Sequence, residues 1–229
     1  MVIKDYYELT KPRLSAVNLL VAGAAFVFGS GATIDWQALA LMLAGLAGVV
    51  TSACVFNNYA DRAIDARMER TKNRTLAAGR MEPAYAIIFG IALLLLGSIL
   101  LLQTHPLALA AALVGFGVYV FVYTPLKSET PYALYAGAVA GAMPPVVGYS
   151  AAAEVLDYYA LGLFFILFLW QIPHFLAIAR YRFDEYKAAG VPLLVERPKN
   201  EEERASARKI FHYSLVFLVV LCLILIIQR

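Results

Sequence analysis

The sequence predicts an all-α bundle of membrane-spanning helices, and three observations support this fold class. Hydrophobic residues make up 62% of the 229 residues and charged residues only 15%, against roughly 25% in an ordinary soluble domain. The mean hydropathy is +0.70. The hydrophobic residues form unbroken runs of about twenty, which is the length that crosses a bilayer as a helix. These values exclude a soluble domain, a disordered chain and a disulfide scaffold, and a β-barrel would need alternating segments of about ten residues.

Seven hydrophobic stretches are each long enough to span a bilayer of about 30 Å. In chain order they cover residues 14–34, 36–59, 84–104, 106–126, 131–152, 158–180 and 210–228. Pro125 is expected to end the fourth of these helices, because proline cannot continue the backbone hydrogen bonding of a helix. In the fifth, Gly141, Pro144, Pro145 and Gly148 predict a broken helix. Irregular backbone at membrane depth is tolerated only where protein or a cavity covers it, so this span is expected to form a pocket wall.

Lysine and arginine lie almost entirely on one side of these spans. Eighteen of the 19 lie before the first span, after the second or fourth, or at the end of the sixth and in the loop that follows it, and Arg229 is the exception. The opposite connections are short and carry four ionisable groups, Asp35, His105, Glu154 and Asp157. By the positive-inside rule the N-terminus and the basic side face the cytoplasm. We expect a multi-pass protein of the plasma or inner membrane, with its site on the cytoplasmic side among the long polar segments 60–83 and 181–209.

Asn57, Asp61 and Asp65 form the first candidate site, at the cytoplasmic end of the second span. Residues four positions apart lie on one face of a helix, so the three side chains are expected to line one stripe. Two carboxylates at this spacing repel each other. A Mg²⁺ ion, which takes one or two carboxylates together with phosphate oxygens, would compensate for them. The alternative is a solvated helix end whose carboxylates pair with Arg62 and Arg67.

Basic residues follow the acidic stripe directly, and they suit a diphosphate. Arginine forks match phosphate oxygens. Topology signals or lipid headgroups would explain the cations equally well, but only a diphosphate needs them beside carboxylates, since Mg²⁺ and arginine together neutralise a leaving diphosphate. The basic residues of this segment are Arg67, Arg70, Lys72 and Arg74, and a separate candidate, Lys127, lies at the end of the fourth span. Tyr123 lies one helical turn before Lys127, and an interfacial tyrosine with a snorkelling lysine is the alternative for this pair.

Trp170, Gln171 and His174 are polar-capable side chains inside the sixth span. A histidine at membrane depth is a functional candidate, and the alternative is a core histidine bonded to a neighbouring carbonyl. Arg182, Asp184 and Glu185 follow the span. The two acidic residues are expected to face Asp61 and Asp65 across the mouth of the bundle, unless they belong to an ordinary solvated loop.

The motifs around these residues resemble the UbiA superfamily of intramembrane prenyltransferases. The superfamily pattern is N-x-x-x-D-R-x-x-D at residues 57–65, R-T-x-x-R at 70–74 and Y-x-x-x-K at 123–127. Finer motifs are similar to the branch that farnesylates haem, and the resemblance runs from about Thr10 to Pro198. These motifs are T-K-P at 10–12, C-V-F-N-N-Y at 54–59, M-E-R-T-K-N-R at 68–74, P-P-V-V-G-Y at 144–149 and L-W-Q-I-P-H at 169–174.

This resemblance implies transfer of the farnesyl group of farnesyl diphosphate to a vinyl group of protohaem IX (haem B), with addition of water, which gives haem O. It implies Mg²⁺ as cofactor, held by Asp61, Asp65, Asp184 and Glu185. The implied catalytic residues are Asp61, Asp65, Asn57 and Tyr123, and the implied diphosphate-binding residues are Arg62, Arg67, Arg70, Lys72, Arg74 and Lys127. The acceptor is expected on His174, Trp170, Gln171 and Arg182. The lipid bilayer, haem A synthase and the terminal oxidase assembly are the further partners expected, and no nucleic acid is.

The sequence also departs from the family pattern. The family usually has nine spans, so residues 1–229 are expected to form a single transmembrane domain that lacks the last two helices. Thr75 stands where members often carry proline. Two alternatives remain. Another prenyltransferase of this type, with a 4-hydroxybenzoate or lipid acceptor, gives no reason for L-W-Q-I-P-H. A transporter that uses Asp61 and His174 as a proton relay would commonly show an internal repeat and polar residues at the membrane midplane.

Overall fold

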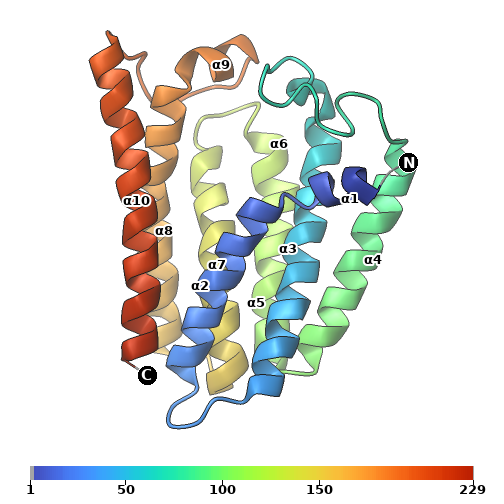
Figure 1. Cartoon of the computed structure of the whole chain (residues 1–229), viewed down its shortest axis with the longest axis vertical. Helices are drawn as coiled ribbons and strands as arrows, with labels where there is room; N and C mark the ends of the chain where they lie inside the picture. Colours follow the sequence, from blue (N-terminus) through green and yellow to red (C-terminus); the bar gives the residue numbers. More distant parts are fainter. Residues whose placement is uncertain (1–2, 229) are drawn as a thin grey trace.

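The computed structural model describes residues 3–228, and the regular secondary structure within them is entirely helical. The long helices stand side by side in one bundle, and the longer connections gather at one end of it, together with α1 and α9 (Figure 1). In chain order the elements are α1 (Ile3–Leu9), α2 (Pro12–Gly29), α3 (Trp36–Asp65), α4 (Pro83–Leu102), α5 (Pro106–Gly117), the π-helix η1 (Val118–Tyr123), α6 (Thr124–Leu126), α7 (Ala133–Ala153), α8 (Tyr158–Tyr181), α9 (Phe183–Ala188) and α10 (Glu201–Ile227).

Six helical segments of the described chain are long and hydrophobic enough to cross a membrane, one fewer than predicted. They are Pro12–Gly29, Trp36–Asp65, Pro83–Leu102, Pro106–Leu126, Tyr158–Tyr181 and Glu201–Ile227. The stretch predicted at 131–152 forms α7, a helix of 21 residues that is rich in alanine, glycine and proline. It is largely buried and packs against α2, α5 and α8. The prediction of an all-helical membrane bundle is therefore confirmed, with α7 as a less hydrophobic helix inside it.

The prediction that Gly141, Pro144, Pro145 and Gly148 break the fifth span is wrong. Helix α7 runs without interruption from Ala133 to Ala153, with both prolines inside it. Two of the small residues allow close packing instead, as is common between membrane helices. A Cβ atom at Gly148 would collide with the backbone carbonyl of Ala22 in α2, and one at Gly141 with the side-chain amide of Gln171 in α8.

Two helices extend further into the polar segments than their hydrophobic stretches do. Helix α3 continues past residue 59 to Asp65, so the whole acidic stripe lies on a helix. Helix α10 begins at Glu201 instead of residue 210, because Asn200 caps it by accepting a hydrogen bond from the Glu203 N–H at 2.8 Å. Three glutamates in its first turn suit the positive end of the helix dipole.

The fourth span changes its helix type close to the polar end of the bundle. Between α5 and α6 the chain forms η1, and the N–H of Thr124 donates to the carbonyl of Tyr119, five residues earlier. The Thr124 hydroxyl donates to the same carbonyl at 2.7 Å. Short π-helical segments are rare and frequently occur at functional sites. Here the segment carries Tyr119 and Tyr123, whose rings stack with centroids 5.3 Å apart.

Candidate functional site

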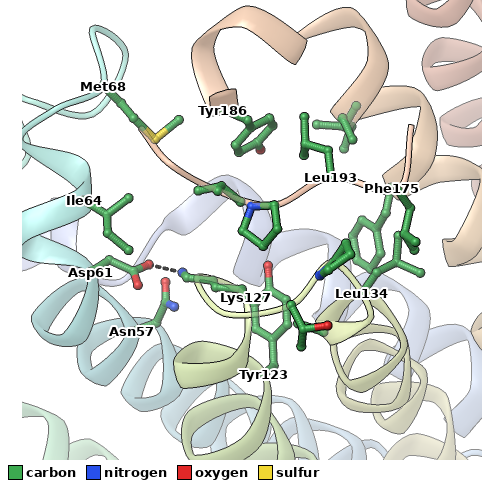
Figure 2. Close-up of a pocket in the computed structure, with 18 of the residues that line it drawn as sticks. Asn57, Asp61, Ile64, Met68, Tyr123, Lys127, Leu134, Phe175, Tyr186 and Leu193 are labelled. Carbon is green, nitrogen blue, oxygen red and sulfur yellow. Dashed lines mark hydrogen bonds and ion pairs between the residues drawn. The ribbon is translucent and has the colours of Figure 1, made fainter. Parts of the chain in front are cut away.

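A pocket of about 290 Å³ lies at the end of the bundle where the basic residues gather (Figure 2). Its walls come from Lys11, α3 and the loop after it, the fourth span, the loop before α7 and its start, α8, and α9 with the segment after it. The polar side chains that line it are Lys11, Asn57, Asp61, Asp65, Arg70, Arg74, Tyr119, Tyr123, Lys127, Thr130 and Tyr186. The predicted stripe and part of the predicted cation cluster therefore share one cavity with tyrosine rings.

The acidic stripe is buried, and each carboxylate is paired with a cation. Asp61 and Asp65 are each 5% exposed. Lys127 donates to Asp61, as Figure 2 shows, and Arg74 Nη1 contacts both oxygens of Asp65, at 3.0 and 2.8 Å. This geometry argues against the alternative of a solvated helix end, because Arg62 turns away to the carbonyl of Tyr59 at 2.6 Å. Both carboxylates and their two cation partners therefore face one pocket, together with Lys11 and Arg70.

Lys11 is a pocket residue that sequence reasoning missed. Its Nζ donates to Oδ1 of Asn57 at 2.5 Å, and Asn57 Nδ2 donates to the Thr124 hydroxyl at 3.0 Å. Burial lowers the pKa of Lys11 to about 8. Its backbone has a φ of 47°, in the left-handed region that is uncommon for lysine, and the chain turns there from α1 into α2. The only sequence signal for this position is the T-K-P motif.

The predicted cation cluster divides into residues that line the pocket and residues that do not. Arg70, Arg74 and Lys127 line it. Arg62 stacks over the ring of Tyr59, with its guanidinium carbon 4.4 Å from the centroid. Lys72 pairs with Glu69 at 2.6 Å, and Arg67 is exposed. The diphosphate-binding role of Arg62, Arg67 and Lys72 thus stays a prediction without a place in this cavity.

The predicted acceptor residues of α8 hold helices together. His174 Nδ1 lies 2.7 Å from the Ser214 hydroxyl of α10, and its ring stacks on Trp170 with centroids 4.8 Å apart. Trp170 Nε1 donates to the carbonyl of Ser214 at 2.9 Å. Gln171 donates to the carbonyl of Ala138 in α7 at 3.2 Å. None of the three lines the pocket, so their role towards an acceptor stays a prediction.

Asp184 and Glu185 are not brought together with Asp61 and Asp65. Asp184 pairs with Arg204 at 2.6 Å and with Arg197 at 3.0 Å, and these guanidinium groups, Arg204 first, hold the pKa of the Asp184 carboxyl below its usual value. Within residues 3–228, no group of three or more Asp, Glu, His or Cys side chains is arranged to hold a metal ion. A metal in the pocket would therefore rely on Asp61, Asp65 and the oxygens of a substrate, and a role of Asp184 and Glu185 as ligands stays a prediction.

Helix α9 and the segment after it cover the pocket, the segment with hydrophobic side chains. Tyr186 and the residues Val191 to Leu194 line the cavity from this side. Glu185 connects the segment to the loop after α3, because it lies 3.3 Å from Arg70 and 3.0 Å from Arg182. Arg182 therefore acts at the edge of the cover and does not line the cavity. The short V-P-L-L stretch at 191–194 lies within a charged loop, and nothing in its sequence predicts that it covers the pocket.

Fold and site together define a class of protein, a multi-pass helical membrane protein with buried, cation-paired carboxylates at one mouth of its bundle. The sequence profile of the UbiA prenyltransferase family matches residues 18–228. The chain belongs to this family.

Relatives and solved structures agree with that assignment. The chain is 42% identical over 196 residues to a protein of Sodalis glossinidius (strain morsitans) named protoheme IX farnesyltransferase, and the match covers 85% of this chain and 66% of the relative. It thus spans just under two thirds of that relative's length. A structure of digeranylgeranylglyceryl phosphate synthase superposes with a TM-score of 0.71 at 21% identity, covering 97% of this chain and 75% of that one. A UbiA homologue from Archaeoglobus fulgidus, bound to GPP and Mg²⁺, gives 0.68 at 18% identity, covering 94% and 86%.

Proposed function

We propose that this chain farnesylates protohaem IX, using farnesyl diphosphate and Mg²⁺ and yielding haem O after addition of water. The observation that carries the proposal is the pocket in which Asp61 and Asp65 lie among Lys11, Arg70, Arg74 and Lys127. Its composition suits a metal–diphosphate headgroup. The relatives named protoheme IX farnesyltransferase, at 42–43% identity, support haem as the acceptor.

The charges of the pocket fit Mg²⁺ together with a diphosphate. Mg²⁺ favours one or two carboxylates and completes its shell with phosphate oxygens and water, and a UbiA homologue of the same fold has been solved with GPP and Mg²⁺. When bound at Asp61 and Asp65, the ion would neutralise charge on the leaving diphosphate. Lys127 and Arg74 now pair with these carboxylates. In the loaded site they would turn to the diphosphate oxygens, joined by Lys11.

The apolar part of the pocket suits an allylic cation. The rings of Tyr119 and Tyr123 line the wall next to Lys127, and an aromatic face stabilises a nearby cation. The hydrophobic cover from Val191 to Leu194 would exclude water while the carbon–oxygen bond to diphosphate breaks. The haem would lie towards α7 and α8, with His174, Trp170, Gln171 and Arg182 as its proposed contacts.

The decisive experiment is to incubate membranes containing the protein with haem, Mg²⁺ and farnesyl diphosphate, and to search for farnesylated haem by mass spectrometry. A product only with 4-hydroxybenzoate or a lipid acceptor would favour another prenyltransferase of the same family. A transporter that uses Asp61 and His174 is the less favoured alternative, because the pocket residues gather at one mouth of the bundle. Haem A synthase and the terminal oxidase assembly remain the proposed protein partners.

We further propose that residues 1–229 form one transmembrane domain, that α7 also crosses the membrane, and that the N-terminus and the pocket face the cytoplasm. A reporter fused after Arg80 or Lys199 is then expected to lie in the cytoplasm, and one inserted near Asp157 is expected to lie outside. The reason is that the basic residues gather on the side that carries Arg80 and Lys199. Paired alkaline phosphatase and fluorescent protein fusions measure this in whole cells. The opposite pattern would place the pocket outside and overturn the orientation.

Replacing His174 by alanine is expected to lower haem affinity or turnover while farnesyl diphosphate binding stays intact, because Asp61, Asp65 and their cations are untouched. Optical titration of haem and a separate diphosphate-binding assay measure the two effects. His212→Ala is the matched control, since His212 is exposed and bonds the carbonyl of Arg208. Haem binding and turnover that both match the wild type would make His174 purely a partner of Ser214. Loss of both ligands would assign it to the packing of α8 against α10.

A further inference from the structure

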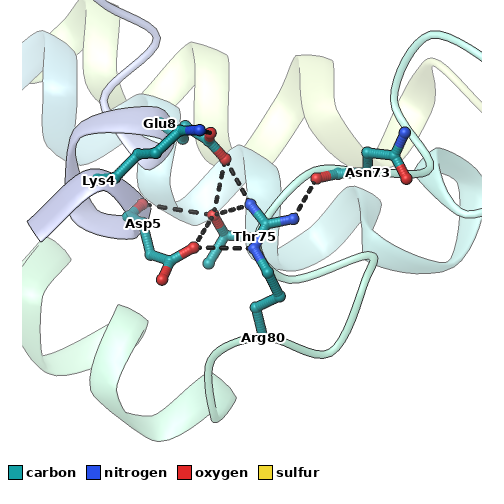
Figure 3. A network of polar contacts seen from close by, with 6 residues as sticks. All are labelled: Lys4, Asp5, Glu8, Asn73, Thr75 and Arg80. Carbon is teal, nitrogen blue, oxygen red and sulfur yellow. Dashed lines mark hydrogen bonds and ion pairs between the residues drawn. The ribbon is translucent and has the colours of Figure 1, made fainter. Parts of the chain in front are cut away.

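Arg80 lies outside the pocket, yet it joins two segments that each contribute a pocket cation (Figure 3). Its guanidinium group donates to Asp5 in α1 at 2.9 Å and to Glu8 at 2.5 Å. It also donates to the Asn73 carbonyl at 2.6 Å and to the Thr75 hydroxyl at 3.1 Å, both in the loop between α3 and α4. The Thr75 hydroxyl, which is buried, lies 3.2 Å from Glu8 as well.

On the α1 side, this network lies a few residues before Lys11. Leu9, at the end of α1, is buried against Val55 and Leu76. Its carbonyl accepts a hydrogen bond from Asn58 Nδ2 at 2.9 Å. Two residues later the backbone turns and Lys11 reaches Asn57. The position of α1 therefore limits where the Lys11 amine can lie in the pocket.

On the loop side, the same network brackets Arg74. Asn73 and Thr75, the residues that Arg80 contacts, are its two chain neighbours. Arg74 itself points into the pocket and pairs with Asp65. Fixing both neighbours therefore limits where the Arg74 guanidinium can move when a ligand replaces its partner.

We propose that Arg80 is a positioning residue that fixes Lys11 and Arg74 relative to each other, so that both contact one diphosphate. The inference rests on the proposed function. The pair between Arg80 and Glu8 is partly exposed on both sides, so it contributes little to folding stability. The Asp5 side chain is only 10% exposed, so loss of Arg80 is expected to cost some stability as well. The distinguishing expectation is a loss of diphosphate affinity larger than this stability loss accounts for, since small displacements of binding groups weaken a ligand strongly.

The test measures the Kd of farnesyl diphosphate with Mg²⁺ for the full chain in detergent. Arg80→Ala is expected to raise this Kd about tenfold, and Arg80→Lys by less, because lysine keeps the charge without the fork. Asp5→Asn, a milder change, should raise it severalfold. Arg13→Ala is the matched control, because it removes one exposed positive charge from the same polar end. Equal Kd values for Arg80→Ala and Arg13→Ala would overturn the proposal.

A double-mutant cycle distinguishes positioning from a general structural role. If Arg80 acts through Lys11, Arg80→Ala should raise the Kd by a smaller factor in a Lys11→Met background than in the wild type. Equal factors in both backgrounds, or a loss of thermal stability that accounts for the affinity loss, would overturn the inference. Failure of the wild type itself to bind farnesyl diphosphate would instead overturn the proposed function and the inference with it. Binding by the wild type and by Arg80→Ala alike would overturn the inference alone.

Discussion

Replacing Asp61 or Asp65 by asparagine is expected to lower prenyl transfer by far more than tenfold, while the protein still inserts into the membrane. Each change removes one of the two carboxylates in the pocket and leaves Lys127 or Arg74 without its partner. The loss of negative charge would weaken the binding of Mg²⁺. The charge that develops on the departing diphosphate would then be less well stabilised. Single-turnover assays with haem and farnesyl diphosphate measure the effect.

Two controls belong to this experiment. Asp35→Asn changes a carboxylate at the opposite end of α3, where it caps the helix by accepting from Ala38 N–H at 2.9 Å. Asparagine caps a helix as well as aspartate does, so this variant should keep its activity. EDTA should abolish turnover in the wild type, and excess Mg²⁺ should restore it. Wild-type rates in both pocket variants would contradict the metal assignment.

Replacing Gly148 by valine should prevent most of the protein from folding. Any Cβ at this position would collide with the backbone carbonyl of Ala22, and a backbone atom cannot move aside as a side chain can. Overpacking typically costs about 1–3 kcal/mol, and the contact between two helix backbones places this change at the upper end or beyond. The yield of monodisperse protein in size-exclusion chromatography and its thermal midpoint in detergent measure the effect.

Gly162→Val is the matched control, because a Cβ atom at Gly162 in α8 has no neighbouring atom within 4 Å. Both variants place the same side chain in a long hydrophobic helix. A normal yield for Gly148→Val would mean that α2 and α7 can move apart without loss of the fold. Equal losses in the two variants would assign the effect to valine in a helix and not to the close contact.

The sequence predicted the parts of the site that lie on one element. The spacing of Asn57, Asp61 and Asp65 predicted a shared helix face, and the structure confirms that all three line the pocket. Lys127 is predicted by the Y-x-x-x-K motif at the end of the fourth span, which resembles the superfamily pattern. In contrast, the hydrophobic cover at Val191 and its neighbours depends on how a loop folds back, which no local pattern specifies.

Errors in the fold arose where residue type was interpreted without its packing partner. A proline considered without its surroundings predicts a break in a helix. In α7, however, both prolines lie within a regular helix that packs between neighbouring helices. Lys11 was overlooked for a similar reason. A lysine before the first span is typical of a topology signal. Only the backbone turn at Lys11, with its φ of 47°, directs the side chain towards Asn57 in the pocket. Tertiary contacts decided both positions.

The π-helix at Val118–Tyr123 also changes which side chains of the fourth span point into the pocket. A turn in such a segment holds more residues than an α-helical turn, so the side chains beyond it are rotated relative to those of α5. Lys127, which lies beyond η1, reaches Asp61 with this rotation in place. If the span were an uninterrupted α-helix, Lys127 would point to a different face. Each extra residue held in the π-helical turn changes the direction of the side chains beyond it by as much as about 100°. The direction of the Lys127 side chain is therefore set by an irregularity of the backbone. The types of the residues in this segment do not by themselves reveal that irregularity.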